Sequence, residues 1–177
     1  MIYYFTPYST EKNLGKYYNE CMAMIPFGSW ACFTDGDAMF TTPDFGHQLE
    51  DIVRLYGDEY KLFTAKTNRV GTKYQCVEGV WDIDCMSTHR NIGKMLQLNK
   101  RLELNDITNA PPMSGVLMLL EKNTWNKSNK FKEAGLLGID NSIHYSIRNT
   151  GNRVGLMEGV YIQHFYRNGS GDNSHLK

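Results

Sequence analysis

A short apolar run that ends in two aspartates constrains the fold of this chain most strongly. The run Trp30–Thr34 is followed directly by Asp35-Gly36-Asp37. Such a run predicts a buried β-strand. Its polar end would lie at the carboxyl edge of a sheet, where open α/β folds bind ligands. Two carboxylates there, with Gly36 allowing a turn that aims both outward, suit Mg²⁺ or Mn²⁺ carrying a phosphate or diphosphate.

The Asp-Gly-Asp motif also has an ordinary structural explanation, because Asp and Gly are common turn residues. A second Asp-x-Asp occurs at Asp82-Ile83-Asp84. The first motif is favoured as a metal site, because a strongly apolar strand precedes it and a glycine, rather than the large Ile83, separates its carboxylates. On the pattern alone, turn and metal site both stay open.

Predicted strands and helices alternate along the chain. Apolar and aromatic runs predict strands at residues 2–6, 30–34, 60–64, 115–120 and 154–163. Apolar residues at three- and four-residue spacing predict helices beginning near Ser9, near Thr42, around residues 89–98, and at Asp140. Residues 65–87 lack clear periodicity and are expected to be irregular. This alternation is typical of an α/β domain with a mainly parallel central sheet flanked by helices.

Length and charge argue for a single domain with a local binding site. The 177 residues suffice for one core, and the 19 basic and 19 acidic residues cancel, which disfavours nucleic acid as a partner. We see no signal peptide and no integral membrane segment. We therefore expect a cytoplasmic protein, with peripheral attachment to a membrane left open. The domain is expected over residues 1–167, followed by a flexible Gly/Ser/Asn-rich tail at residues 168–177.

Two further side chains are candidates for chemistry. Asp140 stands at the expected start of a helix, where an N-cap alone would explain an aspartate. His164 ends the last predicted strand, and a lone histidine in aromatic company is more often packed than ligating. If His164 lies beside Asp37, however, the imidazole and two carboxylates would leave positions open for substrate oxygens, as a catalytic metal requires.

Several motifs, taken in their order along the chain, resemble the GT-A-fold glycosyltransferases, most nearly those similar to family 2. They are Thr6-Pro7-Tyr8, Tyr18-Asn19-Glu20-Cys21-Met22, Phe33-Thr34-Asp35-Gly36-Asp37, Met113-Ser114-Gly115-Val116-Leu117-Met118, Trp125 leading to Phe131-Lys132-Glu133, Gly138-Ile139-Asp140-Asn141, and Gly155-Leu156-Met157-Glu158-Gly159-Val160-Tyr161 with His164, Tyr166 and Arg167. The resemblance spans about residues 2–167 and implies a single short GT-A-like domain, the fold of the nucleotide-diphospho-sugar transferases.

The resemblance implies a metal site and a catalytic base. Asp35 and Asp37 would be the D-x-D motif that holds Mn²⁺ or Mg²⁺ against the donor diphosphate, and His164 would be a late metal or phosphate ligand. Asp140 falls where inverting members place the general base, which accepts the proton of the acceptor hydroxyl.

The resemblance also implies how the donor is held. Backbone groups of Thr6, Pro7 and Tyr8 would line the nucleoside site, and Ser114 and Gly115 would support the donor sugar and the acceptor. The chain passes from Pro7 almost directly to the first helix, where family members usually carry one or two further βα units that grip the base. The nucleoside pocket is therefore expected to be reduced.

The sequence thus predicts a metal-dependent hexosyltransferase-like enzyme that moves a sugar from a nucleotide-sugar donor to a hydroxyl of a glycan or lipid-linked acceptor, as in polysaccharide biosynthesis. The alternative is a non-catalytic nucleotide- or glycan-binding domain on the same scaffold, suggested by the reduced nucleoside site. A nucleotidyltransferase ranks last, because no Gly-rich basic loop follows the first strand to hold a triphosphate. An inverting reaction is expected, but donor, acceptor, anomeric outcome and oligomeric state stay open.

Overall fold

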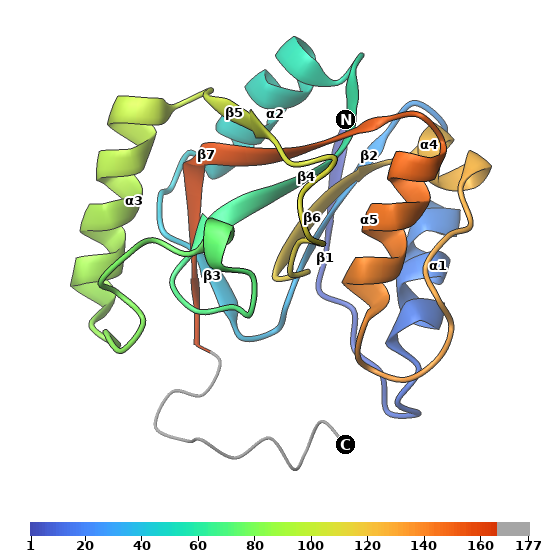
Figure 1. Ribbon diagram of the computed structural model, residues 1–177, viewed down its shortest axis with the longest axis horizontal. Helices are drawn as coiled ribbons and strands as arrows, with labels where there is room; N and C mark the ends of the chain where they lie inside the picture. Colours follow the sequence, from blue (N-terminus) through green and yellow to red (C-terminus); the bar gives the residue numbers. More distant parts are fainter. Residues whose placement is uncertain (166–177) are drawn as a thin grey trace.

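A seven-stranded sheet forms the centre of the protein (Figure 1). The computed structural model describes residues 1–165, so Tyr166, Arg167 and the tail expected at residues 168–177 lie outside the described residues. The strands lie in the order β1 (Ile2–Phe5), β2 (Trp30–Thr34), β6 (Leu117–Glu121), β4 (Tyr60–Thr67), β7 (Arg153–His164) and β3 (Ala38–Phe40), and β5 (Leu104–Asp106) also pairs with β7.

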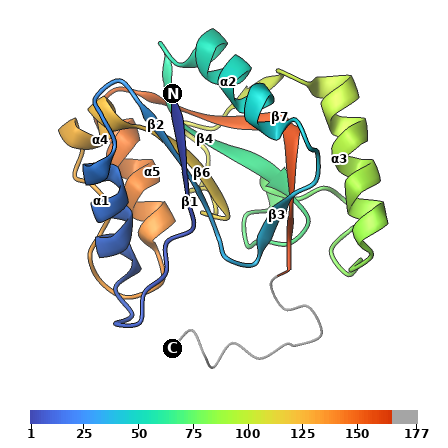
Figure 2. The same ribbon diagram turned by 180° about the vertical axis from the view of Figure 1, so that it is seen from behind.

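Helices cover both faces of this sheet, which confirms the α/β class. They are α1 (Leu14–Met24), α2 (Phe45–Tyr56), α3 (Met86–Lys100), α4 (Lys122–Lys127) and α5 (Ile139–Asn149). In both views α1, α4 and α5 lie together on one side, and α2 and α3 lie away from them (Figures 1 and 2). None of the helices within residues 1–165 is both long and apolar enough to cross a bilayer.

The sheet separates two hydrophobic clusters, because successive residues of a strand point to opposite faces. In β2, Ala31 and Phe33 pack in the cluster with Met22 and Ile143, which come from α1 and α5. The intervening Trp30 and Cys32 pack in the other cluster with Leu49 and Ile52 of α2. The buried strand expected at residues 30–34 is therefore confirmed, and both of its faces are covered.

The expectation of a mainly parallel sheet was wrong, because the sheet is mixed. β1 and β2 pair in parallel, as do β4 and β7, whereas β6 runs antiparallel to both β2 and β4. β3 and β5 run antiparallel to β7. The chain leaves β4 and enters β6 at the same edge of the sheet, where Val70 and Val116 line one cavity. β6 therefore enters in the direction opposite to β4.

Several element boundaries also differ from the expectations. Residue 13, not Ser9, caps α1: the Asn13 side chain accepts a hydrogen bond from the Lys16 N–H, while the Ser9 hydroxyl accepts one from the Asn13 N–H. β4 extends into the segment expected to be irregular, and η1 (Lys73–Gln75) adds a turn of 3-10 helix there. The sequence analysis missed β3, β5 and α4, since three to six residues are too few to display a period.

A bend in β7 brings the end of the strand to β3 (Figure 1). The register against β4 shifts between Ala65 and Lys66, whose partners are Met157 and Tyr161, so extra residues of β7 bulge out of the ladder. Gly159 lies in this bulge, and a Cβ there would come within 2.4 Å of the Lys100 carbonyl oxygen. The close approach of α3 thus requires glycine at the bend.

Candidate functional site

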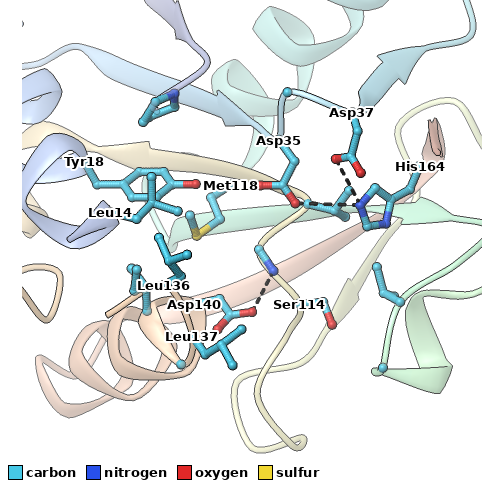
Figure 3. Close-up of a pocket in the computed structure, with 18 residues that line it drawn as sticks. Leu14, Tyr18, Asp35, Asp37, Ser114, Met118, Leu136, Leu137, Asp140 and His164 are labelled. Atoms are coloured by element: carbon cyan, nitrogen blue, oxygen red, sulfur yellow. Dashed lines mark hydrogen bonds and ion pairs between the residues drawn. The ribbon is translucent and has the colours of Figure 1, made fainter. Parts of the chain in front are cut away.

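A cavity of about 470 Å³ opens at the edge of the sheet where β2, β4 and β7 end and β6 begins (Figure 3). This is the carboxyl edge of the parallel strands, the usual ligand site of open α/β sheets. The lining residues that the sequence analysis had selected are Pro7, Asp35, Asp37, Ser114, Gly115, Asp140 and His164. Side chains from five separate segments of the chain therefore meet at one recess.

Asp35, Asp37 and His164 form a cluster in which one ligand atom from each residue lies within 4.8 Å of the others. The His164 Nε2 atom is 3.3 Å from Asp37 Oδ1 and 3.9 Å from Asp35 Oδ2. Ligands at about 2.1 Å from a small divalent cation lie about 3 to 4 Å apart in an octahedral shell. The donor set and its spacing therefore fit Mn²⁺ or Mg²⁺, with coordination positions left for substrate oxygens.

The pairing of β3 with β7 brings the aspartates to the histidine. Ala38 of β3 lies opposite His164 in the antiparallel ladder, and the Phe165 N–H donates to the Asp37 carbonyl oxygen at 2.8 Å.

The turn between β2 and β3 does not depend on its glycine, Gly36. Gly36 has no positive φ, and a Cβ there would meet only the Thr6 methyl group, at 3.7 Å. The conformational role expected for Gly36 was therefore wrong.

The orientation of the His164 ring is set by the backbone. Its Nδ1 atom lies 2.6 Å from the carbonyl oxygen of Arg69, which can only accept, so Nδ1 carries the proton. The Nε2 atom then faces the two carboxylates. A histidine held in this way by a backbone carbonyl on one nitrogen is typical of a metal ligand on the other.

The pKa values of all three side chains in the cluster are shifted when no cation is bound. Burial of Asp35 in the recess, together with the charges of Asp37 and Asp140, raises the pKa of its carboxyl to about 6, although His164 opposes the change. The hydrogen bond to His164 lowers the pKa of Asp37. Burial by itself would lower the pKa of His164, but bonding to Asp37 and to the Arg69 carbonyl outweighs burial and raises it. A cation would therefore compete with protons for this site.

Asp140 lies in the first turn of α5 and is not its N-cap, which corrects the structural explanation considered for it. The residue before the helix is Gly138, with φ +75°. One Asp140 oxygen accepts the Gly115 N–H at 2.9 Å, and the other accepts the Asn141 N–H at 2.8 Å. These bonds direct the carboxylate into the cavity, opposite the metal cluster (Figure 3).

Only some of the residues expected to bind the donor line the cavity. Pro7, Ser114 and Gly115 line the cavity. Thr6 lies beside it, with its hydroxyl 3.3 Å from that of Thr34. Tyr8 lies outside the cavity lining and is 77% exposed.

The second Asp-x-Asp motif has a structural role. The Asp84 carboxylate pairs with the buried Arg69 guanidinium at 2.8 Å, which anchors the loop that precedes α3. Among the described residues, the acidic cluster with metal-ligating geometry includes neither Asp82 nor Asp84.

Part of the cavity wall was missed by the sequence analysis. No role in the site was predicted for Leu14, for Tyr18 or for residues 136 and 137, yet all of them line the recess. Apolar periodicity could not find them, because a helix face turned towards a cavity has the same pattern as one turned towards a core.

Neither a scan against protein-family models nor a search of curated proteins finds a match for this chain.

Proposed function

We propose that this protein is a metal-dependent glycosyltransferase that moves a sugar from a nucleoside diphosphate donor to a hydroxyl acceptor with inversion. The observation that carries the proposal is the meeting of three potential metal ligands and a further carboxylate, Asp140, in one cavity. The resemblance to GT-A-fold enzymes supports the same assignment, because its motifs supply these four side chains.

Asp35, Asp37 and His164 would hold the cation. Mn²⁺ or Mg²⁺, when bound, would neutralise charge on the departing nucleoside diphosphate. The protein itself holds the Nδ1 proton of His164 on the Arg69 carbonyl, so the Nε2 lone pair is available once its own proton is lost.

Asp140 would act as the general base. Its oxygens accept only one backbone N–H each, so each retains a lone pair for the acceptor hydroxyl. The acceptor oxygen would give its proton to Asp140 and form a bond to the anomeric carbon. The bond from that carbon to the diphosphate oxygen would break, and its electron pair would leave with the nucleoside diphosphate. Attack from the side opposite to the leaving group inverts the anomeric centre.

A non-catalytic nucleotide- or glycan-binding domain is the second candidate, and one observation favours it. Within residues 1–165, β1 pairs with β2 alone and forms an edge of the sheet, so no further strand widens the nucleoside side of the cavity. Tyr8, expected there, is exposed. Product release separates the two candidates: a transferase liberates nucleoside diphosphate from a matching donor and acceptor, whereas a binding domain retains the donor intact.

Thermal unfolding tests the metal site that both candidates share. We expect Mn²⁺ together with one of the common nucleoside diphosphates to raise the Tm of the wild-type protein, because ligands that bind only the folded state stabilise it. Asp37→Asn should abolish the joint effect. Asp82→Asn, in the second Asp-x-Asp motif, is the matched control and should behave as wild type. The absence of any metal-linked shift with UDP, GDP, ADP, CDP and dTDP would contradict the proposal.

A further inference from the structure

Tyr18 of α1 is a buried aromatic residue whose ring is held rigidly. The residue is 3% exposed. Its ring packs edge-on against Phe33 of β2, with centroids 4.7 Å apart, and stacks on Phe131 with centroids 4.8 Å apart. Phe33 and Phe131 also contact each other. With the ring fixed on these sides, the direction of its hydroxyl is fixed as well.

The hydroxyl of Tyr18 faces the cavity and makes no hydrogen bond to any residue of the described range 1–165. Figure 3 shows it directed from α1 towards the Asp35 side of the recess. Buried tyrosine hydroxyls usually find a partner. No protein group of the described range takes this position, so a ligand that fills the cavity and displaces water must itself offer the phenol a partner.

This phenol can act only as a neutral group. Burial, and the nearby charges of Asp35 and Asp140, raise its pKa far above the usual value for tyrosine. It therefore keeps its proton at physiological pH and can donate a hydrogen bond to a ligand oxygen. It is not a candidate base or nucleophile.

The position of the hydroxyl indicates which part of a ligand it meets. The hydroxyl points towards the Asp35 side of the recess, and Asp140 lines the same cavity, so a ligand held by the metal cluster and the proposed base passes close to it. In a transferase that space holds the sugar being transferred. The neighbouring wall is apolar, since Leu14, Met118 and Leu136 surround Tyr18 in the cavity. These side chains can pack against sugar C–H groups but cannot satisfy a sugar hydroxyl.

We propose that Tyr18 is a sugar-recognition residue, whose hydroxyl donates a hydrogen bond to one oxygen substituent of the transferred hexose. The inference rests on the proposed function and deepens it. It assigns the substrate class as a hexose that carries an oxygen at the position facing Tyr18, and it predicts discrimination against the donor that is deoxygenated there. A site that hydrogen-bonds a substrate hydroxyl rejects an analogue lacking it, because the polar group of the site is then left unpaired.

Tyr18→Phe tests this directly, because it removes the hydroxyl and keeps the ring packing. UDP-glucose, UDP-galactose and GDP-mannose would be titrated with Mn²⁺ by calorimetry, alongside UDP and GDP. We expect Tyr18→Phe to bind the preferred sugar nucleotide roughly fivefold more weakly than wild type, the typical net effect of one hydrogen bond. Affinity for the nucleoside diphosphate should not change. Tyr17→Phe, on the same helix but outside the cavity lining, is the control.

A second measurement removes the sugar hydroxyl instead of the hydroxyl of Tyr18. Donor analogues with a single sugar hydroxyl replaced by hydrogen would be titrated into both proteins. One analogue should bind wild type more weakly than the parent donor, and Tyr18→Phe should bind that analogue and the parent equally, since the two changes remove the same bond.

The outcomes separate this inference from the proposed function. Equal binding of the sugar nucleotide by wild type and Tyr18→Phe, or a loss in Tyr18→Phe that is equal for the nucleoside diphosphate, would overturn the role of Tyr18 and leave the proposed function standing. If wild type bound no nucleoside diphosphate and no donor with Mn²⁺, both proposals would be overturned.

Discussion

The side chain of Asn68 forms a reciprocal pair of hydrogen bonds with the backbone of His164. The His164 N–H donates to Asn68 Oδ1 at 2.8 Å, and Asn68 Nδ2 donates to the His164 carbonyl oxygen at 3.1 Å. Asn68 directly follows β4, so its amide continues the parallel β4 and β7 pairing beyond the last backbone pair, Thr67 with Ile162. The end of β7 is thereby held where His164 reaches the aspartates.

Asn68→Ala should weaken metal binding without removing any metal ligand. The substitution leaves two buried backbone groups of His164 without their partners, which costs about 1–3 kcal/mol for each unsatisfied group. We expect a lower Tm and a smaller Tm rise on addition of Mn²⁺ and nucleoside diphosphate. Asn91→Ala, at an exposed position of α3, is the control. If Mn²⁺ and nucleoside diphosphate raised the Tm of Asn68→Ala as much as that of wild type, the two hydrogen bonds of Asn68 would not be what positions His164.

Metal binding should weaken as the pH falls. Asp35, whose pKa is raised to about 6, and His164, whose pKa is also raised, must both be deprotonated to bind a cation. The joint Tm shift with Mn²⁺ and nucleoside diphosphate should therefore begin to shrink above about pH 6.5, as His164 gains a proton, and shrink further as the pH passes below about 6, where Asp35 gains one. In the metal-free protein, Asp35 affects the stability of the fold in the opposite direction. Its raised pKa favours the folded state at low pH, and this contribution is lost as the pH rises through about 6.

Calorimetric titration of Mn²⁺ between about pH 5 and pH 8 measures this dependence and the number of protons released. An affinity that did not change over that range would contradict the protonation states assigned to Asp35 and His164.

Asp140→Asn should separate catalysis from binding. The amide oxygen can still accept the Gly115 N–H, and only the exposed bond from the Asn141 N–H is lost. The amide cannot act as a base, so the rate of sugar transfer should fall about 10²–10⁴-fold. Binding of Mn²⁺ and nucleoside diphosphate should be retained. Release of nucleoside diphosphate measures turnover, Asp58→Asn at an exposed turn is the control, and full activity in Asp140→Asn would exclude it as the base.

His144 should make the protein sensitive to acid. It is fully buried on α5, where its Nδ1 atom accepts the Met113 N–H at 3.4 Å. Burial lowers its pKa, with Arg148 acting in the same direction and Asp140 against it. Because the folded state then binds a proton less readily than the unfolded state, this contribution to stability is present above about pH 6.5 and is lost below it.

His144→Asn keeps an acceptor near the Met113 N–H and removes the titration. We expect a Tm that varies less between about pH 7 and pH 5 than in wild type. His47→Asn, which changes an exposed histidine on α2, should leave the wild-type profile. Identical pH profiles for His144→Asn and wild type would contradict the assignment.

Local sequence patterns predicted some elements of the fold and site but not others. The buried strand at residues 30–34 and its polar end were predictable, since an apolar run and the residues after it form one continuous signal. The helix expected at Asp140 exists, but Asp140 lies inside its first turn. The partner of its carboxylate is the Gly115 N–H, which is contributed by a distant segment. The cavity-facing position of Tyr18 could not be predicted, because the spacing of apolar residues along one helix does not distinguish a cavity from a core.

The sequence alone determined the α/β class, the two aspartates at a strand end and the candidacy of His164, because each depends on residues close together in the chain. The tertiary structure decided that β6 runs antiparallel, that β7 bends at Gly159 and that Ala38 pairs with His164. These features place the imidazole 3.3 Å from Asp37. They arise from pairing between strands that are far apart in the sequence, and the choice among possible pairings is made by the packing of the whole sheet rather than by any local pattern.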